Sequence, residues 1–404
     1  MVLKEIHNPF IDSILIPDKF FCDREAETRQ LIENITSNVK TVLYAPRRVG
    51  KSSLIQHVLG QKEIRDNFNS LYVDILGTRD AVGFADELQK ALLDSDFARD
   101  EKIKQTLLSS FPAILTTMAG LFISQDSPVN ISTYATSTIS MSISKIFEYL
   151  ESTKKTTIVV FDEFQKIEEY SEPMAAILRS EIQKLRRTRF IFSGSETHML
   201  SMMFNNRNKP FFSSARDMSI DIISLDKYTD YCKRMFGLFG KGISDDAVKL
   251  TYCTFCGITR SNQEVMRHVF YHTPEGNTAD KADIINAIRN LVISKENSIR
   301  TELGKLSANA HKLLRHIATN GILENPTSTK QQINLTQSQI QHLANKYSSE
   351  DIALLTKVGK NALKITDKLM ELFILGPDRL EERLQHSEAI FQKEQQLTKV
   401  FPEW

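Results

Sequence analysis

Residues 41–52 read TVLYAPRRVGKS, and this stretch decides the fold. An apolar run, Thr41–Ala45, leads directly into a loop that ends in Gly50-Lys51-Ser52, and a helical pattern follows. This is the pattern G-x-x-x-x-G-K-[ST], with Ala45 in the first glycine position. In such a loop, successive backbone N–H groups curl round a phosphate and pass it to a helix N-terminus. The predicted phosphate-binding residues are Ala45, Pro46, Arg47, Arg48, Val49, Gly50, Lys51, Ser52 and Ser53.

The residue types in this loop have separate roles. Gly50 lets the backbone approach the phosphate closely, Lys51 reaches the β- and γ-phosphates, and Ser52 ligates Mg²⁺. Ala45 weakens the pattern little, because a small side chain suffices where the strand ends. The alternative is a chance Gly-Lys-Ser in a loop, but the strand before it and the helix after it argue against chance.

A second apolar strand, Thr157–Phe161, ends in the carboxylate pair Asp162-Glu163. We expect Asp162 to hold Mg²⁺, directly or through water, and Glu163 to orient and polarise the attacking water as a catalytic residue. Taken alone, the pair would indicate only a strand end with solvent-facing acids. Downstream of a phosphate loop, it indicates a nucleotide-hydrolysing site.

A third strand end, Phe190–Ser193, continues as Gly194-Ser195. In nucleotide hydrolases with a catalytic Glu, an extra strand between the loop strand and the acidic strand carries a polar residue toward the γ-phosphate. Ser193 or Ser195 fits that role, and a plain Ser-Gly turn is the alternative. No N-K-x-D guanine-reading motif is found, because Asn208-Lys209-Pro210-Phe211 lacks the Asp. ATP is therefore preferred over GTP.

A γ-phosphate sensor is usually a cationic side chain. For each candidate, an ordinary solvated surface position is the alternative. The candidates are Arg47, Arg48, Arg179, Arg207 and Lys209, with Arg179 taken as the catalytic one.

Composition limits the class of protein. The 404 residues are 41% hydrophobic and 25% charged, with only 15 Gly and 11 Pro, which favours helices joined by short turns. A net charge of +1 gives no global electrostatic argument for nucleic-acid binding. Four cysteines are too few for a disulfide framework. The start has no apolar leader and no stretch is long enough to span a bilayer, so we expect a cytoplasmic protein without a membrane partner.

Strand patterns alternate with helical ones up to Ser224, which is typical of an α/β fold with a parallel sheet. Beyond Ser224 the patterns are helical, and segment 95–150 has no clear period. We predict three domains: an α/β core over 1–224, a helical lid over 225–295 and a C-terminal helical domain over 296–404. The predicted strands are Thr41–Ala45, Ser70–Leu76, Thr157–Phe161, Phe190–Ser193 and Met218–Ser224.

A cysteine-histidine pattern in the lid has two interpretations. The spacing Cys253-x2-Cys256-x11-His268-x3-His272 comes within one residue of a zinc finger. The cysteines lie three residues apart on a predicted helix instead of a hairpin, which favours two buried lid cysteines.

Taken together, these motifs resemble the prokaryotic archaeal-type ATPase family, P-loop ATPases near the STAND and origin-recognition branches of the AAA+ group. The resemblance covers about residues 8–270. It implies a three-layer P-loop core with a parallel five-stranded sheet, a helical lid, a winged-helix-like all-α C-terminal domain, and Arg24 near the adenine. The matching blocks are Asn8-Pro9-Phe10, Phe20–Glu25, Pro46–Ser52, Phe161–Gln165, Leu178-Arg179, Phe192–Ser195 and Met203-Phe204.

Two departures from the family pattern matter. Lys209 replaces the usual Arg before Pro-Phe, so its planar fork is lost. The three winged-helix helices would be Leu306–Ala318, Gln331–Lys346 and Ala362–Leu375, but no β wing is found, because Gly376–Trp404 has a helical pattern. Between 305 and 368, 9 Lys+Arg face 4 Asp+Glu, which is compatible with a phosphate-backbone contact.

The leading hypothesis is an ATP- and Mg²⁺-dependent molecular switch. ATP hydrolysis at Lys51, Ser52, Asp162 and Glu163 would change how the lid and the C-terminal effector domain are held. Family resemblance implies slow turnover unless a protein partner or a second copy supplies an arginine. The alternatives are an ATP-regulated DNA-binding protein and a protein-interaction module that keeps the nucleotide site for structure.

Overall fold

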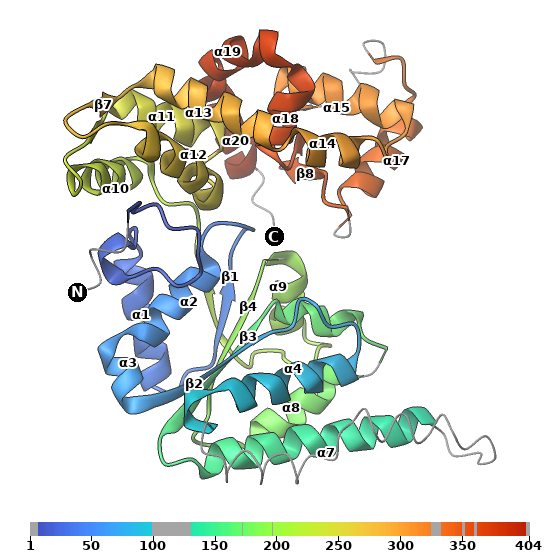
Figure 1. Cartoon of the computed structure of the whole chain (residues 1–404). Helices are drawn as coiled ribbons and strands as arrows, with labels where there is room; N and C mark the ends of the chain where they lie inside the picture. Colours follow the sequence, from blue (N-terminus) through green and yellow to red (C-terminus); the bar gives the residue numbers. More distant parts are fainter. Residues whose placement is uncertain are drawn as a thin grey trace. The chain divides into compact units, whose positions relative to one another are not determined.

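The structure is a computed structural model, and it describes residues 7–98, 131–171, 173–195, 197–324, 333–349, 352–358 and 362–400. The chain forms two compact units (Figure 1). The first contains Ser13–Asp18 and Arg24–Asp221, and the second contains Met1–Asp12, Lys19–Asp23 and Ile222–Trp404. The division of residues 225–404 into a lid and a C-terminal domain stays a prediction.

A five-stranded parallel sheet organises the first unit, as the sequence predicts. Its order is β2-β3-β4-β1-β5, so β4 lies between the loop strand β1 and the acidic strand β3, where the extra strand was expected. Because the strands end at the same edge, the motifs that follow them are brought together. The strands are β1 Thr41–Tyr44, β2 Phe68–Asp74, β3 Thr156–Asp162, β4 Arg189–Gly194 and β5 Arg216–Ser219.

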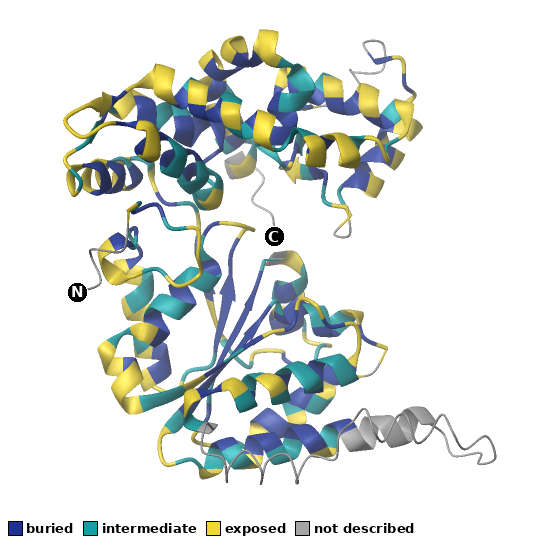
Figure 2. Cartoon of the chain, viewed as in Figure 1, coloured by how far each residue is buried: buried dark blue, intermediate teal, exposed yellow. Residues whose placement is uncertain are grey.

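Helices cover both faces of this sheet. Figure 1 shows α1, α2 and α3 on one side and α4, α7 and α8 on the other, and Figure 2 shows the buried strands between them. Most of segment 95–150, for which no structure was predicted, is either α7 or lies outside the described residues. The helices are α1 Glu25–Thr36, α2 Lys51–Gly60, α3 Lys62–Asn67, α4 Ala81–Asp94, α7 Ile131–Ser152, α8 Met174–Lys184 and α9 Thr197–Asn205, with 3₁₀ turns at Asp18–Phe20, Asp96–Ala98 and Phe164–Glu169.

The second unit is mostly helical and includes residues from the start of the chain. Phe10 is 1% exposed, and its ring packs edge-on against Tyr231, Phe236 and Phe270, with centroids 5.9, 5.6 and 6.0 Å away. The elements are α10 Leu225–Gly237, β6 Gly242–Ile243, α11 Asp245–Thr254, α12 Thr259–His272, β7 Thr278–Ala279, α13 Lys281–Ser294, α14 Glu296–Leu303, α15 Ala308–Asn320, α17 Gln337–Tyr347, α18 Lys368–Leu375, α19 Pro377–Gln385 and α20 Ser387–Val400.

A β-hairpin in the second unit corrects the sequence analysis. Strands β8 Leu355–Val358 and β9 Ala362–Ile365 pair antiparallel, and Leu323 adds an isolated bridge to Leu363. The helix predicted over Ala362–Leu375 therefore begins only at Lys368, and residues 355–358 and 362–365 form a hairpin where a helix was expected. The apolar residues of this segment fit a helical period, but pairing with residues distant in sequence decides the outcome.

The zinc-like pattern does not form a ligand cluster within the described residues. The thiol of Cys256 donates to Glu394 Oε2 at 3.1 Å, and the rings of His268 and His272 stack on each other at 4.3 Å. Burial raises the pKa of the Cys253 thiol to about 11 and that of Cys256 to about 12, so both stay protonated at neutral pH. Both thiols are buried, as in the alternative interpretation.

Among the residues described, no helix combines the length and the apolar character that crossing a membrane requires.

Candidate active site

The predicted phosphate loop joins β1 to α2. β1 is buried along its whole length, and Val49 is 1% exposed, so both ends of the loop are anchored while Pro46, Arg47 and Arg48 are exposed. Gly50 caps α2 with φ +97°, a conformation that glycine adopts without strain. A Cβ added at Gly50 would meet no atom within 4 Å, so the space over this end of the loop is open.

Lys51 and Ser52, the first residues of α2, turn to the end of β3. Lys51 Nζ lies 2.6 Å from Asp162 Oδ1 and 3.1 Å from Glu163 Oε1, although Lys51 is only 6% exposed. Ser52 Oγ donates to Asp162 Oδ2 at 2.7 Å. The structure therefore brings together the loop and the acidic pair, which lie 110 residues or more apart in sequence.

Asp162 is the centre of this network. Ser193 Oγ, at the end of β4, donates to Asp162 Oδ1 at 2.7 Å, and the Tyr72 hydroxyl on β2 donates to Oδ2. Burial alone would raise the pKa of Asp162, but the charge of Lys51 and the hydrogen bonds from Lys51, Ser193 and Tyr72 lower it to about 2. The carboxylate is therefore ionised at any pH near neutrality.

Glu163 is held separately, by the turn after β4. Ser195 donates to Glu163 Oε2 through its hydroxyl at 2.8 Å and its backbone N–H at 3.2 Å, and Gln165 Nε2 donates to the same oxygen at 2.7 Å. Burial opposes ionisation, but Lys51 and these donors lower the pKa of Glu163 below its usual value. Glu163 has φ +57°, which places its side chain beyond the strand end. Ser193 and Ser195 thus serve different carboxylates.

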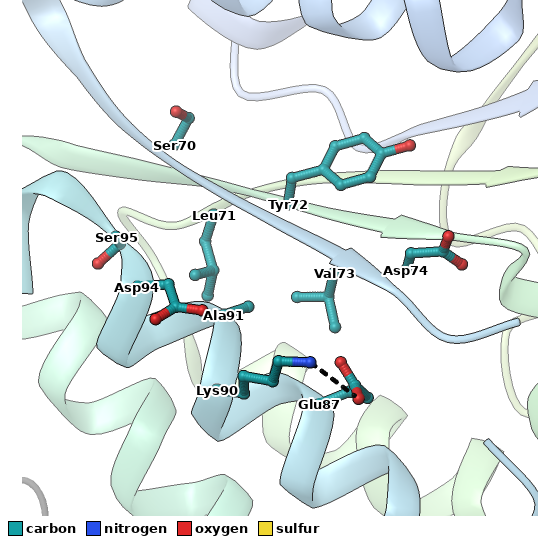
Figure 3. A pocket seen from close by; sticks show the side chains of 10 residues that line it. All are labelled: Ser70, Leu71, Tyr72, Val73, Asp74, Glu87, Lys90, Ala91, Asp94 and Ser95. Atoms are coloured by element: carbon teal, nitrogen blue, oxygen red, sulfur yellow. Dashed lines mark ion pairs between the residues drawn. The ribbon is translucent and has the colours of Figure 1, made fainter. Parts of the chain in front are cut away.

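Tyr72 and Asp74 belong to the site, and the sequence analysis missed both. Figure 3 shows Leu71 and Val73 of β2 directed toward α4, while the Tyr72 ring lies on the opposite side and Asp74 stands at the strand end. Asp74 is in register with Asp162, and burial together with the charges of Asp162 and Glu163 raises its pKa. The signal in the sequence for Asp74 was an acid at the end of a strand. Tyr72, two residues earlier, resembles an ordinary core residue.

Gly194 allows Gln165 to reach Glu163. A Cβ on Gly194 would lie 2.1 Å from Gln165 Oε1, so only glycine fits there without moving the amide. Phe164, the neighbour of Gln165, packs against Phe192 of β4 with ring centroids 4.6 Å apart. The Phe-Asp-Glu-Phe-Gln segment and the Ser-Gly-Ser turn therefore form one packed unit.

Arg24 lies at the base of the phosphate loop. Its guanidinium donates to Glu27 Oε1 at 2.8 Å and to the carbonyl oxygen of Asp221, and it is 5% exposed. Asp221 lies close to the loop, because the N–H of the preceding Ile220 donates to the Tyr44 carbonyl at 3.0 Å and Tyr44 directly precedes Ala45. A contact between Arg24 and adenine stays a prediction.

The structure does not bring Arg179 to the loop. Arg179 lies in the middle of α8, and burial first and then the charge of Arg179 lower the pKa of Lys40, the residue that precedes β1. Lys40 and Arg189 lie where β1 and β4 begin, at the edge of the sheet opposite to the loop. A sensor role for Arg179 within its own chain stays a prediction, and this position argues against it. Lys209 forms an ion pair with Glu168, and Arg207 is exposed.

Comparison with known proteins agrees with this geometry. Residues 21–209 match the family model described as an ATPase domain predominantly from Archaea. An uncharacterized ATP-binding protein of Methanocaldococcus jannaschii is 28% identical over 165 residues, which are 36% of this chain and 43% of that protein. The chain thus spans less than half the length of this curated relative.

Two solved structures share the fold. A Walker-type ATPase of Pyrococcus abyssi superposes with a TM-score of 0.59 at 17% identity, over 91% of this chain and 99% of that one. The ORC2 protein of Aeropyrum pernix, in ADPNP-ADP complexes, superposes with a TM-score of 0.55 at 12% identity, over 97% of this chain and 99% of that one.

Proposed function

We propose that this chain, whose residues 21–209 belong to a family of ATPase domains found predominantly in Archaea, binds ATP with Mg²⁺ and hydrolyses it. One observation carries the proposal. Lys51, Ser52, Asp162 and Glu163 form a single hydrogen-bonded network, and the space next to Gly50 is open. Each side chain is of the type that phosphoryl transfer requires at that place.

The donor set fits Mg²⁺ and phosphate. Ser52 Oγ and Asp162 Oδ2 are oxygen ligands that lie 2.7 Å apart, and Mg²⁺ prefers oxygen ligands. When bound, the ion neutralises charge on the β- and γ-phosphates. Ser52 and Asp162 would hold it, and Ser193 and Tyr72 would keep the carboxylate oriented.

Lys51 and Glu163 would be the two side chains that act directly in ATP hydrolysis. The ammonium of Lys51 forms ion pairs with both carboxylates. On ATP binding, Lys51 would turn its donors to the phosphates, and Glu163 would then be free to accept a proton from the attacking water. The lowered pKa of Glu163 keeps it deprotonated for that role, while Ser195 and Gln165 hold its other oxygen.

Two substitutions separate binding from hydrolysis. Lys51→Ala should weaken binding of a fluorescent ATP analogue by about tenfold or more, because the charged donor to the phosphates is lost. Glu163→Gln should keep binding and lower phosphate release by about a hundredfold or more. Lys62→Ala, an exposed lysine on α3, is the matched control. Unchanged binding and hydrolysis in both site variants would refute the proposal.

We further propose that hydrolysis serves a switch of the AAA+ or STAND type and depends on a partner. The support is the position of Arg179. Because Arg179 lies at the edge of the sheet opposite to the loop, α8 supplies no arginine to the γ-phosphate. A second copy or a protein partner would supply the missing cation. Sedimentation with a non-hydrolysable ATP analogue should show self-association, or hydrolysis should stay slow until a partner is added.

The alternative function is ATP-regulated DNA binding through the C-terminal region. The β8–β9 hairpin favours it, because the absence of a wing was the main argument against it. Filter binding of duplex DNA should then weaken steeply between low and physiological salt, and Lys357→Glu, at an exposed position of the hairpin, should weaken it further. No affinity for DNA at low salt would dismiss this alternative.

A further inference from the structure

A cavity in the second unit is separate from the phosphate loop. Its volume is about 570 Å³, and α13, α14, α15, α18 and α19 all contribute to its lining. This volume lies within the range of small-molecule sites, roughly 300–1,000 Å³. The floor is apolar, made by Leu314, Leu372 and Leu380, each at most 3% exposed. A buried apolar floor of this size accommodates the hydrocarbon or aromatic body of a ligand.

The charged side chains that line the cavity are mostly cationic. Three arginines, Arg289, Arg300 and Arg315, line it together with one acid, Glu296. Arg300 is bound to Glu296 at 2.7 Å and lies over the ring of Phe373, with 5.2 Å between the guanidinium carbon and the ring centroid. Arg289 is bound to Glu381 at 2.6 Å. Both ion pairs are solvent-exposed, so a competing anion displaces the glutamates at little cost.

The third arginine is available. Within the part of the chain that the structure describes, the Arg315 side chain makes no hydrogen bond or ion pair, and neither does the side chain of His311. His311 and Arg315 are four residues apart on α15, so they lie on one face of the helix, and both line the cavity. Both side chains are exposed to solvent, so an anionic group that enters the cavity can reach two side chains that no other described side chain binds.

We propose that this cavity binds a small amphipathic anion, with an apolar body on the leucine floor and a carboxylate or phosphate head on Arg315 and His311. Guanidinium groups recognise both head groups through charge-assisted hydrogen bonds. The volume of about 570 Å³ favours a small molecule over a peptide segment. The site is distinct from the phosphate loop, so the proposal stands or falls independently of ATP hydrolysis.

Calorimetric titration of the full chain tests this proposal. Dodecanoate and dodecyl phosphate, each below its micelle concentration, should bind with one-site behaviour, and dodecyltrimethylammonium, with a similar chain and a cationic head, should bind about tenfold or more weakly. Tighter binding of the carboxylate or of the phosphate identifies the natural head group, and either result supports the shared chemistry. Equal binding of all three, or binding of none, overturns it.

Substitutions on α15 locate the head-group site. Arg315→Glu should weaken dodecanoate binding by about tenfold or more, because an attractive charge becomes repulsive. Lys312→Glu makes the same charge change on the same helix at an exposed lysine outside the lining, and should leave binding unchanged. Ile293→Trp, at a 60% exposed lining position, should narrow the cavity without affecting folding. Equal effects of Arg315→Glu and Lys312→Glu would overturn the assignment.

Discussion

Asp162 accepts hydrogen bonds from Lys51, Ser52, Ser193 and Tyr72, donors that come from three separate segments of the chain. Sequence patterns marked the first three as site residues, because each occupies a motif position at or beyond a strand end, although Ser193 was expected to face the γ-phosphate or the water. Tyr72 could not be predicted in this way, since a tyrosine inside a strand is typical of packing. Its role follows from which strand lies beside β3, and only the strand order gives that.

The depressed pKa of Asp162 predicts acid sensitivity. A carboxylate whose pKa is about 2 in the folded state contributes stability that is fully present above its unfolded pKa and is lost as the pH falls through about 2. The contribution at neutral pH is about 2 kcal/mol. Urea unfolding between pH 5 and pH 2 should show this loss, and Asp162→Asn should flatten the curve. An unchanged pH dependence in the variant would contradict the assignment.

Tyr72→Phe removes a single hydroxyl from the site. The loss of a donor to a buried carboxylate should lower the free energy of unfolding by about 2 kcal/mol and raise the pKa of Asp162. Tyr271→Phe is the control, because Tyr271 is 77% exposed. Chemical denaturation measures the difference, and equal stability of the two variants would show that the Tyr72 hydroxyl does not stabilise the carboxylate.

At the scale of elements, the sequence predicts what is local and continuous. Strands β1, β2, β3 and β4 are found within two residues of their predicted limits, because the strands of a parallel sheet are rich in apolar residues. β5 is Arg216–Ser219 instead of Met218–Ser224, and its burial pattern is mostly exposed. The β8–β9 hairpin was missed because its four-residue strands are defined by cross-strand pairing and not by a period in the sequence.

Gly194 tests the packing of two elements at the site. Gly194→Ala would place a Cβ 2.1 Å from Gln165 Oε1 and 3.1 Å from Leu200 Cδ2, so the buried Gln165 must move and release Glu163. ATP hydrolysis should fall by about tenfold to a hundredfold with little change in ATP affinity. Gly60→Ala, where a Cβ would meet no atom within 4 Å, is the matched control. Equal hydrolysis rates in the two variants would rule out this dependence.

At the scale of the molecule, a buried hydrogen bond joins the predicted lid to the C-terminal region. The thiol of Cys256, in the predicted lid, donates to Glu394, which also binds Lys364. Glu371, which is fully buried, binds Lys368 and Arg383 within the C-terminal region. Because separating the two parts would break the contact of a buried thiol with a buried carboxylate, we expect residues 225–404 to unfold as one body despite the predicted boundary at 295.

The packing of Phe10 leads to a second prediction at the scale of the molecule. Phe10→Ala should destabilise the second unit by about 3–5 kcal/mol, because a fully buried ring among three aromatic neighbours is replaced by a cavity. Thermal unfolding measures the effect. Phe212→Ala, at a 40% exposed position, should cost much less. Equal losses would mean that Phe10 is not packed as described.

The path of the chain between its two units has a consequence for any attempt to separate them. The chain passes from one unit to the other after Asp12, Asp18, Asp23 and Asp221. A protease that cuts only at 221–222 would leave the first unit whole, but residues 7–12 and 19–23 of the second unit would stay attached to it. A fragment that starts at Ile222 would lack Phe10, so we expect it to be less stable than the second unit in the intact chain.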